Sequence, residues 1–206
     1  MKIGGFDSFT LSDYPSEIAA IVFTQGCNFR CPFCHNGSLI PANITEVQLI
    51  PQEKVLSELQ AKSKKLDAVV ISGGEPTLQP DLSDFIICCK SMGFKIKLDT
   101  NGSRPDIIEK LLQDKLLDYI AMDIKAPLES YDRLAGVKIN VELIQQSISL
   151  IAQSGIPHQF RTTNVNTLLS PDDLKKIHAL IPQNSPYILQ DFKPDNVYNP
   201  GLCNLR

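Results

Sequence analysis

The sequence of 206 residues contains no long hydrophobic run and no marked excess of either charge. No stretch approaches the roughly 18 apolar residues that a membrane-spanning helix requires. Twenty Lys and Arg against 23 Asp and Glu leave a net charge of −3. A protein whose main task is to grip nucleic acid would carry a basic excess or a basic stripe. We therefore expect a chain that neither spans a membrane nor binds nucleic acid.

The N-terminal residues also lack the features of a secretory signal, because they include Asp7 and Asp13 and no apolar segment. We therefore expect a cytoplasmic protein in a reducing environment, where disulfides are rare. Six cysteines in such a chain indicate metal-binding or catalytic thiols more than bridges. Three of them, at positions 27, 31 and 34, fall within one short segment, and the other three are scattered.

Neither a low-complexity segment nor a long linker divides the chain, and its length is ordinary for one domain. We expect a single domain over residues 1–206, with a core of about residues 15–194. Residues 1–14 would form an N-terminal extension, and residues 195–206 would form a tail.

Short apolar runs alternate with segments of helical spacing along this core. Strands are predicted at residues 18–24, 66–72, 94–99, 117–124, 158–163 and 187–190, and helices at residues 51–62, 81–92, 106–115, 141–153 and 171–180. In the helix at 141–153, one side carries Leu143, Ile144, Ile148 and Ile151. Strands that alternate with helices are typical of an α/β fold with a parallel sheet.

Every predicted strand is followed by a polar or glycine-rich loop. These loops are residues 26–34, 72–76, 99–102, 122–125, 161–164 and 189–193. Right-handed crossovers bring the carboxyl ends of parallel strands to one edge of the sheet, where binding sites form. We therefore expect the functional site at this edge.

The first loop carries Cys27, Cys31 and Cys34 in the spacing C-x3-C-x2-C. Clustered thiolates suit zinc or iron–sulfur. Because a [4Fe–4S] cube usually takes four cysteines, three would leave one iron open to a substrate. A zinc site is the alternative, with His158 or Cys203 as its fourth ligand. His35 is badly placed for that role, because it directly follows Cys34.

With Phe33 before the third cysteine, this motif resembles that of the radical S-adenosylmethionine (SAM) enzymes. With His35 and Asn36 after it, the run CPFCHN resembles the activating enzymes of glycyl radical proteins. Residues 9–36 are similar to the activating proteins of anaerobic ribonucleoside-triphosphate reductase, with Ser16 where glycine is usual, and the resemblance extends over about residues 3–194.

The resemblance implies a partial (βα)6 TIM-like barrel whose open side admits a protein substrate. It implies a [4Fe–4S] cluster on the three cysteines and SAM on the free iron. Reductive cleavage of SAM would then create a glycyl radical on anaerobic ribonucleotide reductase. A flavodoxin- or ferredoxin-like reductant would supply the electron.

The resemblance also assigns SAM-binding roles to the loops after the second and third predicted strands, and to Phe33 in the first loop. Gly73 and Gly74 belong to a loop that would bind the SAM amino group through backbone carbonyls, and Glu75 would fix that loop by accepting backbone N–H groups. On this basis, Gly74→Val should block SAM binding and spare the cluster. Asp99 and Thr100 would lie near the methionine carboxylate, the ribose or a monovalent cation.

In the next two loops, Asp123 and Lys125 stand two residues apart at a strand end and therefore face the same side. The resemblance places Asp123 with Asp99 and Thr100, and Lys125 on the SAM carboxylate. A solvated surface ion pair is the alternative for the two residues. Arg161 would pair with a carboxylate or cover the barrel rim.

Other residues give weaker signals. Gln190 and Lys193 follow the last predicted strand, and Cys88 and Cys89 fit apolar packing in a helix. Cys203 is expected to be an ordinary residue of the tail.

Two other functions remain open at this point. One is a radical enzyme with a small-molecule substrate, like a 7-carboxy-7-deazaguanine synthase. The other is a zinc-binding interaction module without catalysis.

Overall fold

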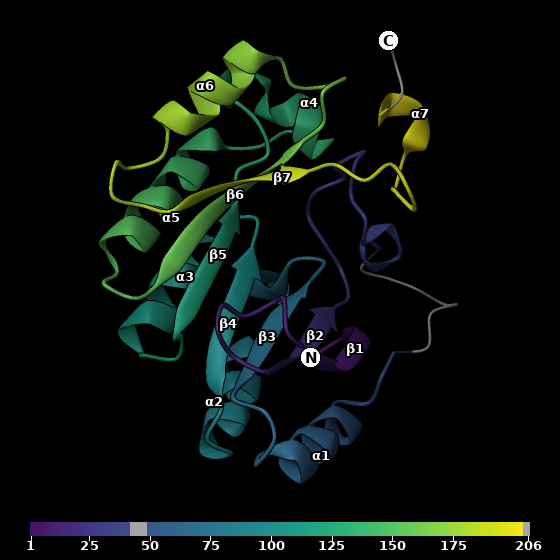
Figure 1. The fold of residues 1–206 in the computed structure, drawn as a ribbon, viewed down its shortest axis with the longest axis vertical. Coiled ribbons are helices and arrows are strands. Elements are labelled where there is room, and N and C mark those ends of the chain that lie inside the picture. Colours follow the sequence, from purple (N-terminus) through teal and green to yellow (C-terminus); the bar gives the residue numbers. More distant parts are fainter. Residues whose placement is uncertain (42–48, 204–206) are drawn as a thin grey trace.

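A computed structural model describes residues 1–41 and 49–203, with the backbone only for the last two. Its centre is a seven-stranded sheet in the order β1 to β7 (Figure 1). Six neighbouring strands are parallel: β2 Ala19–Thr24, β3 Ala68–Gly73, β4 Lys95–Thr100, β5 Tyr119–Asp123, β6 His158–Asn164 and β7 Tyr187–Asp191. The predicted α/β fold with a parallel sheet is confirmed, and each predicted strand lies within two residues of its expected bounds.

The first strand, β1 Ile3–Thr10, was not predicted, because residues 1–14 were taken as an extension without a strand. It pairs antiparallel with β2, and its register shifts twice along the way. Only Ile3 and Thr10 of this strand are buried. An edge strand with two glycines and no apolar run has little side-chain signature, since backbone hydrogen bonds to β2 hold it in place.

The predicted helices correspond to α1 Gln52–Lys62, α2 Leu82–Ser91, α3 Pro105–Gln113, α5 Val141–Gln153 and α6 Pro171–Ala179. Two short helices were not predicted, α4 Tyr131–Ala135 and α7 Pro200–Cys203. Segments this short carry too few turns to show a helical period. Single 3-10 turns form at η1 Gly37–Leu39, η2 Pro76–Leu78 and η3 Leu128–Ser130. None of the helices in the described part of the chain is long and apolar enough to cross a membrane.

The helices pack on one face of the sheet and bury the main apolar core. Ile71, Leu98 and Ile120 of the strands share this core with apolar residues of α1, α2, α3 and α5. In α5, Ile144, Ile148 and Ile151 are buried as expected, but Leu143 is 36% exposed. Leu143 lies about 100° around the helix from Ile144, so it points away from the sheet.

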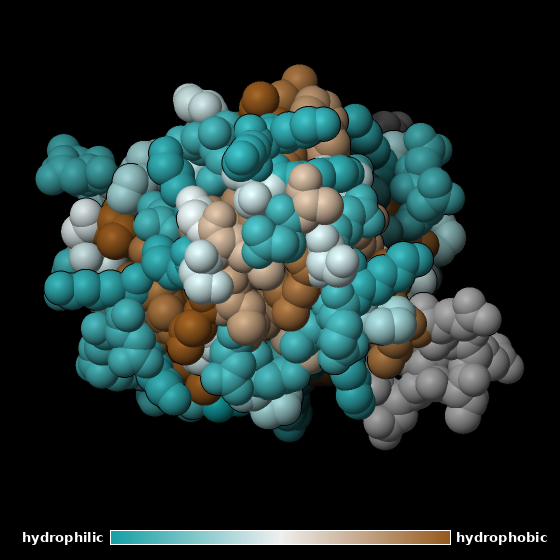
Figure 2. All heavy atoms as spheres, turned by 90° about the horizontal axis from the view of Figure 1, so that it is seen from below, coloured by the Kyte–Doolittle hydropathy of each residue, from teal (hydrophilic) through white to brown (hydrophobic). Residues whose placement is uncertain are grey.

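Residues 11–17 close the opposite, inner face at the end where the strands begin. Tyr14 is buried there, with its ring centroid 5.7 Å from that of Tyr119. The carbonyl oxygen of Asp13 accepts a hydrogen bond of 2.5 Å from Lys97 Nζ, and Glu17 forms an ion pair with Lys95. Seen from below, apolar side chains gather in the middle of the face and hydrophilic ones surround them (Figure 2). We call the apolar cluster around Tyr14 on the inner face the floor. The polar residues of the inner face lie beyond it, at the carboxyl edge of the sheet.

Candidate active site

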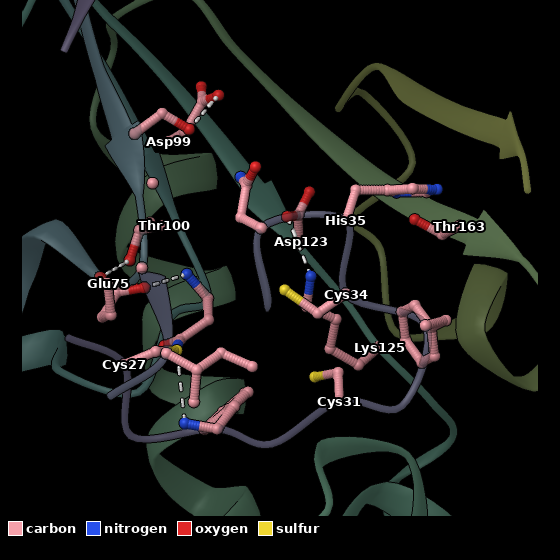
Figure 3. Close-up of a pocket in the computed structure, with 18 of the residues that line it drawn as sticks. Cys27, Cys31, Cys34, His35, Glu75, Asp99, Thr100, Asp123, Lys125 and Thr163 are labelled. Atoms are coloured by element: carbon pink, nitrogen blue, oxygen red, sulfur yellow. Dashed lines mark hydrogen bonds and ion pairs between the residues drawn. The ribbon is translucent and has the colours of Figure 1, made fainter. Parts of the chain in front are cut away.

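One cavity at the carboxyl edge brings together every residue that the sequence assigned to the site. Its walls include the loops after β2, β3, β4 and β5 and the ends of β6 and β7 (Figure 3). The predicted residues on these walls are Cys27, Cys31, Phe33, Cys34, Gly73, Gly74, Glu75, Asp99, Thr100, Asp123, Lys125 and Arg161. The weaker candidate Gln190 also lines the cavity.

The cysteine loop is held in shape by backbone hydrogen bonds. The N–H groups of Gly26 and Cys27 donate to the carbonyls of Leu39 and Ile40, at 2.8 and 3.0 Å. Cys31 is only 5% exposed, and burial raises the pKa of Cys27 to about 11 and that of Cys31 to about 12. Free thiols with these pKa values stay protonated at neutral pH, and a bound metal would displace the protons.

The three cysteines line one cavity from different positions. Within residues 1–41 and 49–203, no three His, Cys, Asp or Glu side chains converge closely enough to hold one metal ion. In an iron–sulfur cube each thiolate binds a different iron, so the sulfurs surround the cluster and need not converge. Three soft thiolates around one cavity therefore fit a [4Fe–4S] cluster with one iron left free.

His158 is excluded as a fourth zinc ligand by its position. It begins β6, at the edge opposite the cysteine loop, and its ring nitrogens contact Ile156 O and Ser185 Oγ. His35 Nε2 instead donates to the carbonyl oxygen of Lys193 at 2.7 Å. The zinc role proposed for Cys203 concerns a side chain outside the described part of the chain.

Glu75 fastens the loop after β3 to the loop after β4. Its carboxylate is completely buried and accepts hydrogen bonds from Thr77 N at 3.1 Å, Thr100 Oγ1 at 2.7 Å and Asn101 N at 2.7 Å. Burial raises the pKa of Glu75, and these hydrogen bonds oppose that rise. As the sequence predicted, Glu75 accepts backbone N–H groups, and one of them belongs to the neighbouring loop.

The two glycines before Glu75 are required by contacts within the protein. Gly73 has a φ of +109°, which favours glycine. A Cβ on Gly74 would lie 2.2 Å from the carbonyl oxygen of Gly26 and 3.0 Å from that of Leu39. The prediction that Gly74→Val spares the cluster is therefore wrong, because the added side chain would first strike the backbone of the cysteine loop.

A chain of alternating charges crosses the inner face of the sheet and ends beside the cysteines. Lys97 Nζ lies 2.8 Å from Asp99 Oδ1, and Arg161 Nη1 lies 3.3 Å from Asp99 Oδ2. Arg161 Nε is 2.7 Å from Asp123 Oδ1, and Lys125 Nζ is 3.0 Å from Asp123 Oδ2. Arg161 therefore bridges two carboxylates.

The pair Asp123–Lys125 is not a solvated surface pair, since the two side chains are only 28% and 16% exposed. Burial alone would raise the pKa of Asp123, but the charges of Arg161 and Lys125 outweigh it and hold that pKa well below the usual range. Burial would lower the pKa of Lys125, and the charge of Asp123 reverses this effect. Both groups are therefore charged at neutral pH.

Sequence reasoning missed several residues that shape the site. Lys97 is 2% exposed and is the first member of the charge chain. Its spacing of two from Asp99 was the available signal, since both must face the same side of β4. Asn28 and Asn101 connect the cysteine loop to the loop after β4 by a hydrogen bond of 2.9 Å. Cys88 and Cys89 lie in α2, where Cys89 is buried in the apolar core as expected.

The segment after β7 lies against the cysteine loop, although residues 195–206 were predicted to be a plain tail. Tyr198 N donates to Cys34 O and Asn199 N donates to Pro32 O, both at 2.9 Å. The His35 ring contacts Phe192, at a centroid distance of 5.9 Å, in addition to Lys193 O. We call residues 192–199 the strap, because they hold the outer side of the cysteine loop.

Comparisons with known proteins match this chain to one family model and to named relatives. A family model described as the radical SAM superfamily matches residues 21–181. A protein of Methanocaldococcus jannaschii, named as a glycyl-radical enzyme activating enzyme, is 31% identical over 208 residues, which cover 98% of this chain and 85% of that protein. A pyruvate formate-lyase-activating enzyme of Listeria monocytogenes is 33% identical over 186 residues, covering 84% of this chain and 73% of that enzyme.

Another relative, whose name gives a small-molecule product, aligns over less of this chain. The 7-carboxy-7-deazaguanine synthase of Methanopyrus kandleri is 33% identical over 132 residues, covering 55% of this chain and 52% of that enzyme. Among solved structures, SuiB of Streptococcus suis bound to the precursor peptide SuiA has a TM-score of 0.65 at 20% identity. The match covers 87% of this chain and 40% of SuiB, so the likeness concerns the fold.

Proposed function

The chain belongs to the radical SAM superfamily and is homologous to glycyl-radical enzyme activating enzymes, and from this premise we propose that it generates a glycyl radical on an anaerobic ribonucleoside-triphosphate reductase. The observation that carries the proposal is the cavity that places three cysteines, a glycine loop and a charge chain together. The resemblance of residues 9–36 to the activating proteins of that reductase supports the choice of partner.

We propose that Cys27, Cys31 and Cys34 hold a [4Fe–4S] cluster whose free iron takes SAM. When bound, these groups would supply reductive one-electron cleavage of SAM, the chemistry needed to remove the Cα hydrogen of the target glycine. The protein's own contribution is to bind and orient SAM and the target glycine and to exclude water from the cavity.

The charge chain provides partners for the methionine part of SAM. Lys125 is the last residue of the charge chain and lies on the side of Cys31 and Cys34 (Figure 3). Its positive charge lowers the pKa of the Cys31 thiol, against the effect of burial. Asp123 holds Lys125 and Arg161 in place from both of its oxygens. Lys125 beside the cysteines and Arg161 on the other side of Asp123 are both fixed cations on the cavity wall, and fixed cations can bind a carboxylate without reorganising.

The loops that carry Gly73, Gly74 and Glu75 complete the cofactor wall. Glu75 fixes the positions of Thr100 and Asn101 in the next loop through its two oxygens. The backbone after β3 therefore cannot shift independently of the backbone after β4. We propose that this rigid wall, together with Phe33 and Asp99, orients the amino group and ribose of SAM.

The sheet is open between its two end strands, which supports a protein as substrate. In the described part of the chain, β1 and β7 are the ends of the sheet and each pairs with one neighbour only. A polypeptide carrying the target glycine could approach the cavity from this side. A flavodoxin- or ferredoxin-like protein would supply the electron.

The decisive experiment follows one hydrogen atom. The protein is reconstituted with iron and sulfide without oxygen, reduced, and mixed with SAM and with anaerobic ribonucleotide reductase that carries deuterated glycine. Deuterium should move into 5′-deoxyadenosine, and an organic radical should appear on the reductase in electron paramagnetic resonance spectra. Pyruvate formate-lyase, treated in parallel, should gain much less radical.

Absence of both signals with the reductase would overturn this choice of partner. A radical on pyruvate formate-lyase alone would keep the activating function and change its target. Turnover of a pterin-like small molecule without any protein radical would replace the activating function by the deazaguanine-type alternative.

A further inference from the structure

Asn101 lies where the loop after β4 meets the cysteine loop, and its side chain reaches a sulfur atom. Its Nδ2 is 2.9 Å from Asn28 Oδ1 and 4.0 Å from Cys27 Sγ. The second distance is at the long end for an N–H···S hydrogen bond. Asn101 is only 6% exposed, so water competes little for these contacts.

The orientation of the Asn101 amide is fixed by its neighbours. The backbone N–H of Ser103 can only donate, and it lies 2.9 Å from Asn101 Oδ1. The other end of the amide is therefore the NH2 group, whose two hydrogens meet two acceptors, Asn28 Oδ1 and Cys27 Sγ. Asn28 Nδ2 donates to Ser103 Oγ at 2.8 Å, which turns the Asn28 oxygen toward Asn101.

The backbone of Asn101 is held equally firmly. Its N–H donates to the buried carboxylate of Glu75 at 2.7 Å. Glu75 thus sets the position from which the Asn101 amide points at Cys27. Cys27 Sγ also accepts the backbone N–H of Phe29 at 3.4 Å.

Cys27 differs from the other two cysteines in this respect. Among the described residues, no hydrogen bond to the sulfur of Cys31 or Cys34 is present, whereas the charge of Lys125 acts on both Cys27 and Cys31. Hydrogen bonds to the sulfurs are one of the factors that set the reduction potential of an iron–sulfur cluster. An N–H donor stabilises the more negative, reduced form more than the oxidised form.

We propose that Asn101 is a positioning residue that directs an N–H donor at the Cys27 thiolate and thereby raises the reduction potential of the cluster. The inference rests on the proposed cluster-binding role of the three cysteines. It does not depend on which protein receives the radical.

The test is a redox titration of the reconstituted protein without SAM and without a partner protein. Asn101→Ala should lower the reduction potential, with an effect on the order of tenfold in the reduction equilibrium, or ~59 mV for a one-electron couple. Asn166→Ala is the matched control, since Asn166 lies in the loop after β6 and borders a separate cavity. It should keep the wild-type potential.

A wild-type potential in cluster-loaded Asn101→Ala would overturn the inference. If that variant holds no cluster, wild-type protein with isotope-labelled asparagine side-chain nitrogen replaces it. Pulsed electron paramagnetic resonance of the reduced cluster should then detect coupling to that nitrogen, and absence of coupling would overturn the inference. A shifted potential in a protein that forms no glycyl radical would support this inference and contradict the proposed function.

Discussion

The three thiols of Cys27, Cys31 and Cys34 line one cavity, and each has a different environment. Cys31 is almost completely buried, Cys27 accepts two N–H groups, and Cys34 lies under the strap. Because each thiolate would hold a different iron, loss of one leaves an iron without a protein ligand. The three residues should therefore be equally necessary.

We predict that Cys27→Ala, Cys31→Ala and Cys34→Ala each abolish cluster binding, measured as iron and sulfide content after anaerobic reconstitution. The matched control is the double variant Cys88→Ala with Cys89→Ala, since both residues lie in α2. The control should keep the wild-type iron content. Loss of iron in the control, with retention in Cys31→Ala, would show that the ligand assignment is wrong.

A second residue-scale feature is the dependence of two cations on one carboxylate. Asp123 Oδ1 and Oδ2 contact Arg161 and Lys125 separately, so loss of the Asp123 charge removes the ion pair that holds Lys125 and one of the two that hold Arg161. Losing one partner of an exposed pair costs about 0–1 kcal/mol. In a fully buried pair the cost is about 3–5 kcal/mol. Because these side chains are partly exposed, we expect the free-energy cost of losing Asp123 as a partner to lie between these two ranges.

We predict that Asp123→Asn lowers 5′-deoxyadenosine release, measured with dithionite as electron donor, by on the order of tenfold while the cluster is retained. Asp106→Asn is the control, because Asp106 forms an exposed ion pair with Arg104, at 59% and 40% side-chain exposure. That variant should release 5′-deoxyadenosine at the wild-type rate. Equal release from both variants would return the Asp123 pair to a structural role.

At the scale of elements, the strap joins the last strand to the first loop. Its contacts to the cysteine loop include backbone hydrogen bonds from Tyr198 and Asn199. Gly37 accommodates this packing, since a Cβ there would lie 3.2 Å from Cα of Tyr198. The strap thus covers the outer side of a loop whose inner side faces the cavity.

We predict that a chain ending at Pro194 loses its cluster several-fold faster than the full chain when exposed to a chelator. The measurement is the rate at which the brown colour of the cluster disappears. The reason is that two backbone hydrogen bonds no longer hold the outer side of the cysteine loop. A chain ending at Cys203 keeps the strap and is the control. Equal rates in the two shortened chains would mean that the strap does not stabilise the loop.

At the scale of the whole molecule, the inner face of the sheet is divided into an apolar floor and a polar cavity. Tyr14, Ile21 and Val70 belong to a second apolar cluster, separate from the core beneath the helices. Lys97 stands at the boundary, bonded to Asp13 O on the floor side and to Asp99 on the cavity side. The floor therefore supports the first member of the charge chain.

We predict that Tyr14→Ala lowers the free energy of unfolding by about 3 kcal/mol, because it removes a buried ring from the floor. The measurement is denaturant unfolding of the cluster-free protein. Tyr14→Phe keeps the ring and should stay close to wild type. A loss below about 1 kcal/mol in Tyr14→Ala would show that the floor contributes little to stability.

The sequence by itself determined the parallel α/β order and the strand-end loops that line the cavity. Alternating strand and helix patterns are local, and parallel strands must bring their carboxyl ends to one edge. The loops after those strands therefore had to meet, so that Cys27, Glu75, Asp99 and Lys125 could be assigned to one site without coordinates. The cysteine spacing indicated zinc or iron–sulfur, and the resemblance of the motif to that of the radical SAM enzymes indicated which of the two to expect.

Only the tertiary structure decided which groups touch. Pairing of β1 with β2 depends on backbone hydrogen bonds between distant segments, and these leave no side-chain pattern. The contact of Gly74 with Gly26 and the packing of the strap on Cys34 likewise join segments far apart in the chain. Sequence periodicity reports which face a residue occupies, but the partner across a face is set by how the elements pack. For that reason the Asn101 amide and the full charge chain appeared only in three dimensions.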